Sequence, residues 1–188
     1  MFSTAQADIS ALPVLFATAS EPTGHLDILV CNAASAVVAP IADVTEASYD
    51  QLMATNLKGP FFAIQKAGEV LADGGRIIAL STLNTVLPAP GISLYAGSKG
   101  ALEQFAKVAA REFGGRGITV NTVSPGATDT DMFRESNDES AAGTMIGMTA
   151  LGRVGEPADI ADVVGFLAGP DGRWITGQNL RATGGLLI

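Results

Sequence analysis

Tyr95 and Lys99 stand four residues apart in a stretch whose apolar residues have helical spacing. Side chains four residues apart share one face of a helix. A lysine ammonium beside a phenol favours the phenolate, which lowers the pKa of the tyrosine from its ordinary value of about 10. Tyr95 is therefore a candidate general acid or base, although a packed tyrosine beside a solvated lysine is the commoner meaning of such a pair taken alone.

Thr82 stands thirteen residues before Tyr95, directly after an apolar run. Its hydroxyl is a candidate hydrogen-bond donor to a substrate oxygen on which negative charge accumulates. The neighbouring Ser81 is the alternative, because a threonine is stiff about its first side-chain torsion and its hydroxyl is less free to turn. Of the two, we favour Thr82.

Four apolar runs bounded by turn residues predict the buried strands that would position these groups. These runs cover residues 27–31, 76–80, 118–123 and, more weakly, 178–182. Three helical patterns alternate with them. The first begins at the N-cap Thr45, the second carries Tyr95 and Lys99 and stops at Gly114, and the third begins near Pro157.

Strands and helices in alternation predict an α/β protein with right-handed crossovers and helices on both faces of a parallel sheet. We expect one domain over residues 1–188, with a doubly wound, mostly parallel, Rossmann-like sheet. Residues 131–155 mix methionines with glycines and acidic residues. This stretch is expected to be irregular and to form a mobile lid over a site.

The composition argues against several classes of protein. The formal net charge is -8, with 11 Lys and Arg against 19 Asp and Glu, which opposes binding to nucleic acid. Cys31 is the single cysteine, so no internal disulfide can form and a reducing cytoplasm fits best. His25 is the single histidine, and we expect no metal site. No apolar run reaches roughly 20 residues, so no membrane segment is expected.

Six segments in chain order carry a family resemblance. They are Cys31-Asn32-Ala33-Ala34, Asn56-Leu57-Lys58-Gly59, Thr82 with Tyr95-Ala96-Gly97-Ser98-Lys99, the stretch 120–130 with its Pro-Gly-x-x-x-Thr turn, and the late segments 151–157 and 175–178. The chain thereby resembles the short-chain dehydrogenase/reductase family, and in particular its 3-oxoacyl-[acyl-carrier-protein] reductase-like members. Residues 5–10 look like the end of that family's third strand.

The resemblance implies an NAD(P)-dependent oxidoreductase that interconverts a small-molecule carbonyl and an alcohol. It assigns Tyr95 as the acid/base, Thr82 to the substrate oxygen, Lys99 to the nicotinamide ribose and Asn56 to a water-mediated proton path to Lys99. An alternative interpretation is that Asn56 makes only local structural hydrogen bonds. The cofactor contacts that the resemblance implies are Asp8, Ile9, Asn32, Ala33, Tyr95, Lys99, Pro125, Gly126, Thr128 and Thr130.

The family's Thr-Gly-x-x-x-Gly-x-Gly loop does not occur among the 188 residues, and neither do its first two strands. That loop binds the pyrophosphate, and the second strand distinguishes NAD from NADP, so the choice between the two cofactors stays open. In the family's sheet the first strand lies beside the strand predicted at 27–31. We therefore expect that strand to have an open, apolar edge that is prone to pair with another chain.

A second hypothesis is that the chain is a non-catalytic, family-derived interaction protein. It would form a homo-oligomer, a dimer or a tetramer, through the helix faces that relatives use for assembly, and it would bind no dinucleotide. Under either hypothesis the residues leave the substrate class open, since neither 87–94 nor 131–155 carries a charge pattern that selects one.

Overall fold

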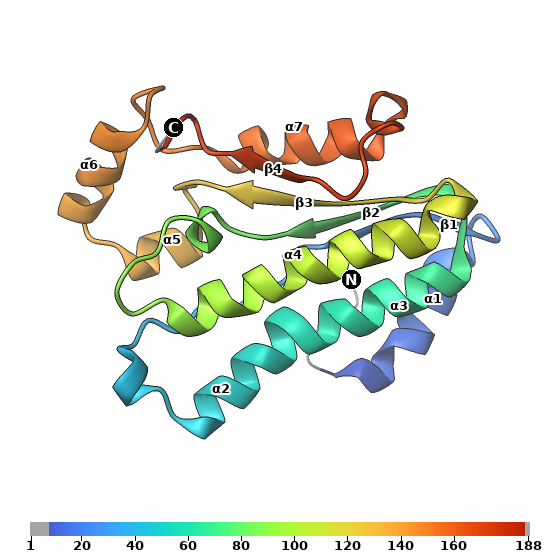
Figure 1. The fold of residues 1–188 in the computed structure, drawn as a ribbon, viewed down its shortest axis with the longest axis horizontal. Coiled ribbons are helices and arrows are strands. Elements are labelled where there is room, and N and C mark those ends of the chain that lie inside the picture. Colours follow the sequence, from blue (N-terminus) through green and yellow to red (C-terminus); the bar gives the residue numbers. More distant parts are fainter. Residues whose placement is uncertain (1–7, 187–188) are drawn as a thin grey trace.

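The computed structural model describes residues 8–186, in which helices alternate with strands along the chain (Figure 1). In chain order the elements are η1 (Ile9–Ala11), α1 (Leu12–Ser20), β1 (Leu26–Cys31), η2 (Ile41–Asp43), α2 (Glu46–Met53), η3 (Ala54–Lys58), α3 (Gly59–Val70), β2 (Leu71–Leu80), η4 (Leu83–Thr85), α4 (Ser93–Phe113), η5 (Gly114–Arg116), β3 (Thr119–Pro125), α5 (Asp131–Ser136), α6 (Glu139–Met148), α7 (Pro157–Ala168), η6 (Pro170–Gly172) and β4 (Asn179–Ala182). The η3 segment is a π-helical turn that joins α2 to α3.

The sheet has the strand order β1-β2-β3-β4, and every neighbouring pair is parallel. Helices α1, α3 and α4 lie on one face of it and α7 on the other (Figure 1). Successive residues of a strand point to opposite faces, so Ile77 packs with the core under α3 and α4 while Ile78 packs with Leu167 of α7. The predicted α/β class with helices on both faces is confirmed.

One edge of the sheet is formed by β1, which pairs with β2 alone among the described strands. Leu29 and Cys31 pack into the core under α3, whereas Ile28 and Val30 on the other face are 43% and 41% exposed. Exposed apolar side chains on an unpaired edge favour pairing with another strand. The open edge is confirmed, and association through it remains a prediction.

Residues 131–155 are not irregular, so that expectation is wrong. They contain α5 and α6, and each helix begins at a side chain that accepts a hydrogen bond from a backbone N–H. Thr130 accepts from the amide of Phe133, and Asp138 accepts from the amide of Ala141. These N-caps satisfy amide groups that a short helix leaves unpaired.

The amino-terminal end departs from expectation as well. Residues 5–7 of the expected strand end lie outside the described residues, and Ile9 and Ser10 form part of the 3-10 helix η1 rather than a strand. Asp8 accepts hydrogen bonds from the amide and the hydroxyl of Ser10 at 3.0 and 2.6 Å. An aspartate that caps its own following turn in this way favours a helical start over an extended chain.

Replacement of Leu102 tests the core on which α4 rests. Leu102 is a fully buried residue of α4 itself. Leu102→Ala is expected to lower the free energy of unfolding by about 2–5 kcal/mol, because it removes buried methyl groups and leaves a cavity. Val108 lies on the same helix and is 55% exposed, so Val108→Ala should cost less than about 1 kcal/mol. Urea denaturation of both variants measures the difference, and equal losses would contradict the packing described here.

Candidate active site

Helix α4 positions both Tyr95 and Lys99. Tyr95 lies in its first turn and is partly buried, and Lys99 follows one turn later with 2% of its surface exposed. The Lys99 ammonium donates a hydrogen bond of 2.7 Å to the carbonyl oxygen of Leu80, at the carboxyl end of β2. The helix is thereby fixed against the end of the strand that leads into Thr82.

The structure brings Thr82, and not Ser81, to Tyr95. Thr82 is close enough to Tyr95 to lower its pKa, and its hydroxyl donates to Asn84 Oδ1 at 3.2 Å, while the hydroxyl of Ser81 is buried and donates to Glu103 Oε1 at 2.6 Å. Thr82 also accepts from the backbone amide of Asn84 at 3.3 Å and so begins η4. The geometry therefore favours Thr82 over its neighbour as the hydroxyl beside the phenol.

The protonation of Tyr95 differs from expectation. We expected the Lys99 ammonium to lower the pKa of Tyr95, and this is wrong for the structure. Burial raises the pKa of Tyr95 above its ordinary value of 10.0, and the opposing influence comes from the side chain of Thr82. Removal of the phenol from water disfavours the charged phenolate, so Tyr95 is a neutral phenol at neutral pH.

Burial also shifts the two ionisable groups behind Tyr95. It lowers the pKa of Lys99 from 10.5 to about 8, because the ammonium has lost its hydration. It raises the pKa of Cys31 to about 12, so the buried Cys31 side chain is a neutral thiol near pH 7. Lys99 is consequently the group in this cluster that changes charge nearest to neutral pH.

Asn56 is fully buried within the π-helical turn η3. Its Oδ1 accepts from the Ser35 amide at 2.9 Å, and its Nδ2 donates to the Ser35 carbonyl at 2.8 Å and to Ser98 Oγ at 3.3 Å. Asn56 thus joins the loop after β1 to the residue next to Lys99. These contacts bear out its role as a structural hydrogen-bonder, and the water path to Lys99 remains a prediction.

Most of the residues expected at the cofactor follow the carboxyl ends of parallel strands. Asn32 and Ala33 come after β1, Pro125 is the last residue of β3, and Gly126 follows it. Both pairs therefore lie at the edge of the sheet where Thr82 follows β2. A Cβ atom on Gly126 would come within 2.9 Å of the Thr183 backbone, so a glycine is needed there for the chain after β4 to pass.

The remaining expected contacts divide into two groups. Thr128 donates to the Gly126 carbonyl at 3.1 Å, and Thr130 caps α5, which places both just beyond the end of β3. Asp8 and Ile9 lie instead at η1, which packs against α1 and α3. Among the described residues, the hydrogen bonds of the Asp8 side chain go to Ser10, and none joins Asp8 or Ile9 to Tyr95, Lys99 or Thr82.

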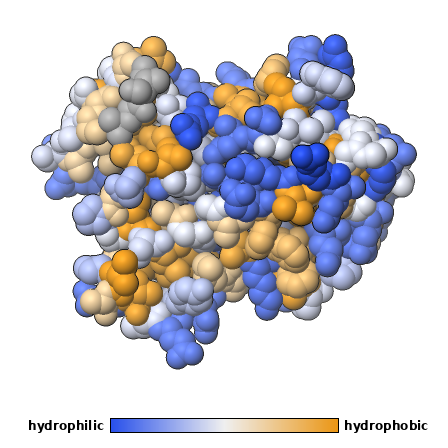
Figure 2. All heavy atoms as spheres, in the orientation of Figure 1, coloured by the Kyte–Doolittle hydropathy of each residue, from blue (hydrophilic) through white to orange (hydrophobic). Residues whose placement is uncertain are grey.

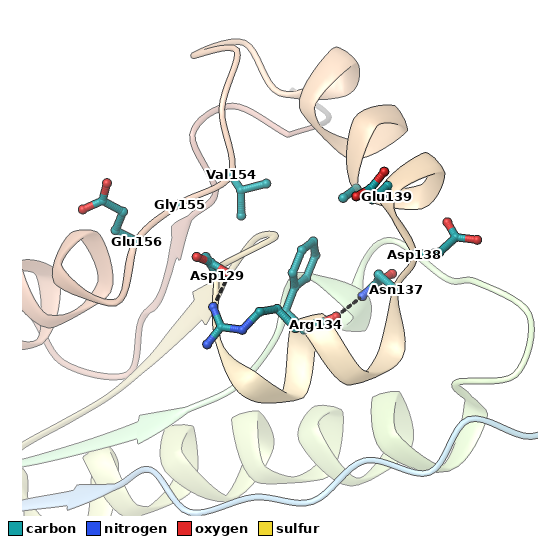
Figure 3. A pocket seen from close by; sticks show the side chains of 10 residues that line it. Asp129, Arg134, Asn137, Asp138, Glu139, Val154, Gly155 and Glu156 are labelled. Carbon is teal, nitrogen blue, oxygen red and sulfur yellow. Dashed lines mark hydrogen bonds and ion pairs between the residues drawn. The ribbon is translucent and has the colours of Figure 1, made fainter.

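A pocket of about 430 Å³ opens between α5, α6 and the segment 154–156 (Figure 3). Arg134 points across it to Asp129, with the two side chains 2.5 Å apart. Neither Thr82, Tyr95 nor Lys99 lines this pocket. The segment predicted as a lid therefore borders a hollow of its own, beside the turn that follows β3.

Residues 8–186 contain neither a metal site nor a membrane-spanning helix. No three His, Cys, Asp or Glu side chains converge there as ligands for a metal ion. No helix in this range combines the length and the apolar character needed to cross a bilayer.

Comparisons with known proteins agree with this geometry. The family model described as Enoyl-(Acyl carrier protein) reductase matches residues 5–187. The hydroxynaphthalene reductase-like protein Arp2 of Metarhizium brunneum is 39% identical over 196 residues, which cover 96% of this chain and 73% of that protein.

Solved structures are similar to the same extent. The angucycline C-6 ketoreductase LanV with bound NADP is 43% identical, with a TM-score of 0.87 over 96% of this chain and 71% of its own. A blue fluorescent protein from a metagenomic library, in complex with NADPH, is 39% identical, with a TM-score of 0.91 over 97% of this chain and 74% of its own.

The chain therefore belongs to the short-chain dehydrogenase/reductase family. It spans between 71% and 74% of the length of these relatives, so its four-stranded sheet is partial relative to their full fold.

The lowered pKa of Lys99 predicts a dependence of stability on pH. Between pH 8 and 10.5 the unfolded chain holds a Lys99 proton that the folded chain has released, so the free energy of unfolding of the wild type should rise by about 3 kcal/mol relative to that of Lys99→Met. Above pH 9 the unfolded chain releases a Cys31 proton that the folded chain keeps, which lowers the free energy of unfolding in both proteins. Urea denaturation at a series of pH values should therefore show this rise as a growing difference between the wild type and Lys99→Met.

A control for this measurement lies on the same helix. Lys107 of α4 is exposed, so Lys107→Met should keep the rise above pH 8. Parallel pH profiles of the wild type and Lys99→Met would show that the buried ammonium is not its source.

Proposed function

We propose that this chain interconverts a carbonyl and an alcohol, with NAD or NADP as the hydride carrier and Tyr95 as the acid/base. The observation that carries the proposal is the placement of Tyr95 beside Thr82 and one helical turn from the buried Lys99, which donates to the Leu80 carbonyl at 2.7 Å. This cluster lies at the carboxyl edge of a parallel sheet, where α/β folds bind their ligands. A phenol, a hydroxyl and an ammonium together suit proton transfer to a polarised oxygen.

The Lys99 donors fit a nicotinamide ribose. An ammonium has three N–H donors, and the Leu80 carbonyl takes one of them at 2.7 Å, with no further acceptor for Lys99 within residues 8–186. The other two donors suit ribose hydroxyls, and Asn32, Pro125 and Gly126 would line the nicotinamide from the ends of β1 and β3. A Gly-x-x-x-Gly-x-Gly turn, which would bind the pyrophosphate, does not occur in residues 8–186. The residues that fit the cofactor are therefore those around its nicotinamide half.

Each residue of the cluster has one task in the proposed reaction. When bound, the reduced nicotinamide supplies the hydride. Tyr95 gives its phenol proton to the substrate oxygen, and the Thr82 hydroxyl hydrogen-bonds that oxygen as negative charge accumulates on it. The positive charge of Lys99, one turn away, stabilises the phenolate that remains.

The relatives suggest a finer assignment of cofactor and substrate. LanV and the metagenomic blue fluorescent protein were solved with NADP and NADPH, so we propose NADP for this chain as well. The names of LanV and the Metarhizium protein refer to an angucycline ketone and to hydroxynaphthalenes. A ketone on a fused aromatic ring system is the substrate class that we would test first.

Removal of one hydroxyl tests the role of Tyr95. Tyr95→Phe is expected to lower the rate of NADPH oxidation with an aromatic ketone by about 100-fold to 10,000-fold, because it deletes the proton donor and keeps the ring. The chain has two tyrosines, and Tyr49 on α2 is 48% exposed, so Tyr49→Phe is the matched control and should keep full turnover. Unchanged turnover in Tyr95→Phe would defeat the assignment.

The alternative, a non-catalytic oligomer, has some support on the surface. Apolar side chains interrupt the polar surface over α3 and α4 (Figure 2), where Phe61 and Val108 are 38% and 55% exposed. Phe61 also stacks edge-on against Phe105 of α4, with ring centroids 5.0 Å apart. Such a patch suits contact with a second copy of the chain. An oligomer of this kind is compatible with catalysis, but its formation does not require catalysis.

Calorimetry separates the two proposals. The enzyme proposal predicts that the chain binds NADPH with a micromolar Kd, and that Lys99→Met weakens binding by about 10-fold to 100-fold through the loss of charged hydrogen bonds. The oligomer proposal predicts assembly without binding of NADPH or NADH. Assembly measured by light scattering, together with no heat of binding, would favour the second proposal over the first.

A further inference from the structure

Glu103 is a buried carboxylate that the proposed reaction does not use. It lies in α4 with 9% of its surface exposed. Its Oε1 accepts one hydrogen bond from Ser81 Oγ at 2.6 Å and another from Thr85 Oγ1 at 2.9 Å. Burial strips a carboxylate of its hydration, and the protein must replace those hydrogen bonds. Two hydroxyls of one short segment do so here.

These two hydroxyls stand on either side of Thr82. Ser81 precedes it at the end of β2, and Thr85 closes η4, the turn that Thr82 itself begins. Thr85 Oγ1 also lies within 3.1 Å of the Thr82 carbonyl oxygen. One carboxylate therefore fixes the chain both before and after Thr82, the residue that lies beside Tyr95.

Glu103 shares a helix face with Tyr95 and Lys99. The three residues follow one another at steps of four, which places them in line along α4. The helix thus carries the phenol at one level and, two turns further on, the group that holds the segment bearing Thr82. The distance between the phenol and the Thr82 hydroxyl is then set by the geometry of a single rigid helix.

The contacts of Glu103 continue into the sheet. Ser124 Oγ lies 3.5 Å from Glu103 Oε1, and it donates at 2.8 Å to Asn179 Oδ1. Ser124 belongs to β3 and Asn179 to β4. The carboxylate is therefore held in place from the sheet as well as from α4, and it is a fixed anchor rather than a mobile surface group.

We propose that Glu103 is a positioning residue, which holds residues 81–85 so that the Thr82 hydroxyl meets the Tyr95 phenol. Its effect on turnover rests on the proposed function, whereas its effect on the position of Thr82 does not. Glu103 touches no reacting atom in this scheme and acts through Thr82 alone.

The kinetic test compares Glu103→Ala, Glu103→Gln and Glu112→Gln. Glu103→Ala frees both hydroxyls and should lower kcat by about 10-fold to 100-fold with little change in KM for NADPH. Glu103→Gln keeps an oxygen that accepts from these hydroxyls and should recover part of that loss. Glu112 is exposed on the same helix, so Glu112→Gln should leave kcat unchanged. A rise in KM with kcat unchanged in Glu103→Ala would overturn the inference.

A double-mutant cycle shows whether Glu103 acts through Thr82. Thr82→Val is introduced into the wild type, into Glu103→Ala and into Glu103→Gln. If Glu103 only positions Thr82, its replacement costs nothing further in kcat once the Thr82 hydroxyl is gone. An equal loss with and without that hydroxyl would show an independent or general structural effect and would overturn the inference. Glu103→Gln keeps the side-chain volume, so it carries the comparison if the alanine variant does not fold.

A crystal structure of the Glu103 variant supplies a readout that needs no turnover. The inference predicts that the Thr82 hydroxyl moves away from the Tyr95 phenol in Glu103→Ala, and that it keeps its wild-type position in Glu112→Gln. If the wild type turns over no carbonyl, the proposed function fails and this measurement still decides the role of Glu103. A Thr82 hydroxyl at its wild-type distance from the Tyr95 phenol in Glu103→Ala would refute the positioning role.

Discussion

The hydrogen bond from the Lys99 ammonium to the Leu80 carbonyl, 2.7 Å long, is the contact on which the candidate site depends. A buried ammonium without a partner costs several kcal/mol, so α4 can pack closely on β2 only where such an acceptor lies opposite Lys99. The carbonyl at the end of a parallel strand provides it. Thr82 lies two residues after Leu80, and Tyr95 lies one helical turn before Lys99. The contact between Leu80 and Lys99 therefore brings the Thr82 hydroxyl and the Tyr95 phenol together at this end of the sheet.

The loop after β1 is tied to this arrangement by Asn56. A continuous α-helix from α2 to α3 is interrupted at η3 by a π-helical turn, a wider turn that is often found at functional sites. Asn56 in that turn satisfies both the amide and the carbonyl of Ser35 and also reaches Ser98, the neighbour of Lys99. The segment that begins with Asn32 is thereby anchored to the helix that carries Tyr95.

Local signals predicted the elements that position the site, and they failed where structure depends on distant contacts. The apolar runs marked every strand. However, β2 begins at Leu71, earlier than the run at 76–80. Gly74 adopts a positive φ of 79°, and the register between β1 and β2 shifts near this point, so the pairing continues back to Leu71. The caps Thr130 and Asp138 were visible signals for α5 and α6, although glycines and acidic residues obscured the helical spacing between them.

The spacing from Tyr95 favoured Thr82 over Ser81, but the reason that Ser81 is occupied needed tertiary structure, because the carboxylate that binds it lies 22 residues further along the chain. A sequence signal for that carboxylate did exist. Glu103 stands one turn after Lys99 on a face otherwise occupied by Leu102 and Ala106, which marks a charge that faces the core. Proximity alone does not tell which hydroxyl it will bind.

The error over the pKa of Tyr95 has a consequence for the direction of the proposed reaction. Spacing along the helix showed a positive charge one turn away, but desolvation depends on the surroundings of the phenol and is the largest influence on its pKa, opposed by Thr82. A phenol whose pKa lies above 10.0 is protonated at neutral pH, and a protonated group can donate but cannot accept. Without cofactor the cluster is therefore set to give a proton to a carbonyl oxygen. Oxidation of an alcohol would first require removal of the Tyr95 proton, because the influence of Thr82 does not offset the burial of the phenol.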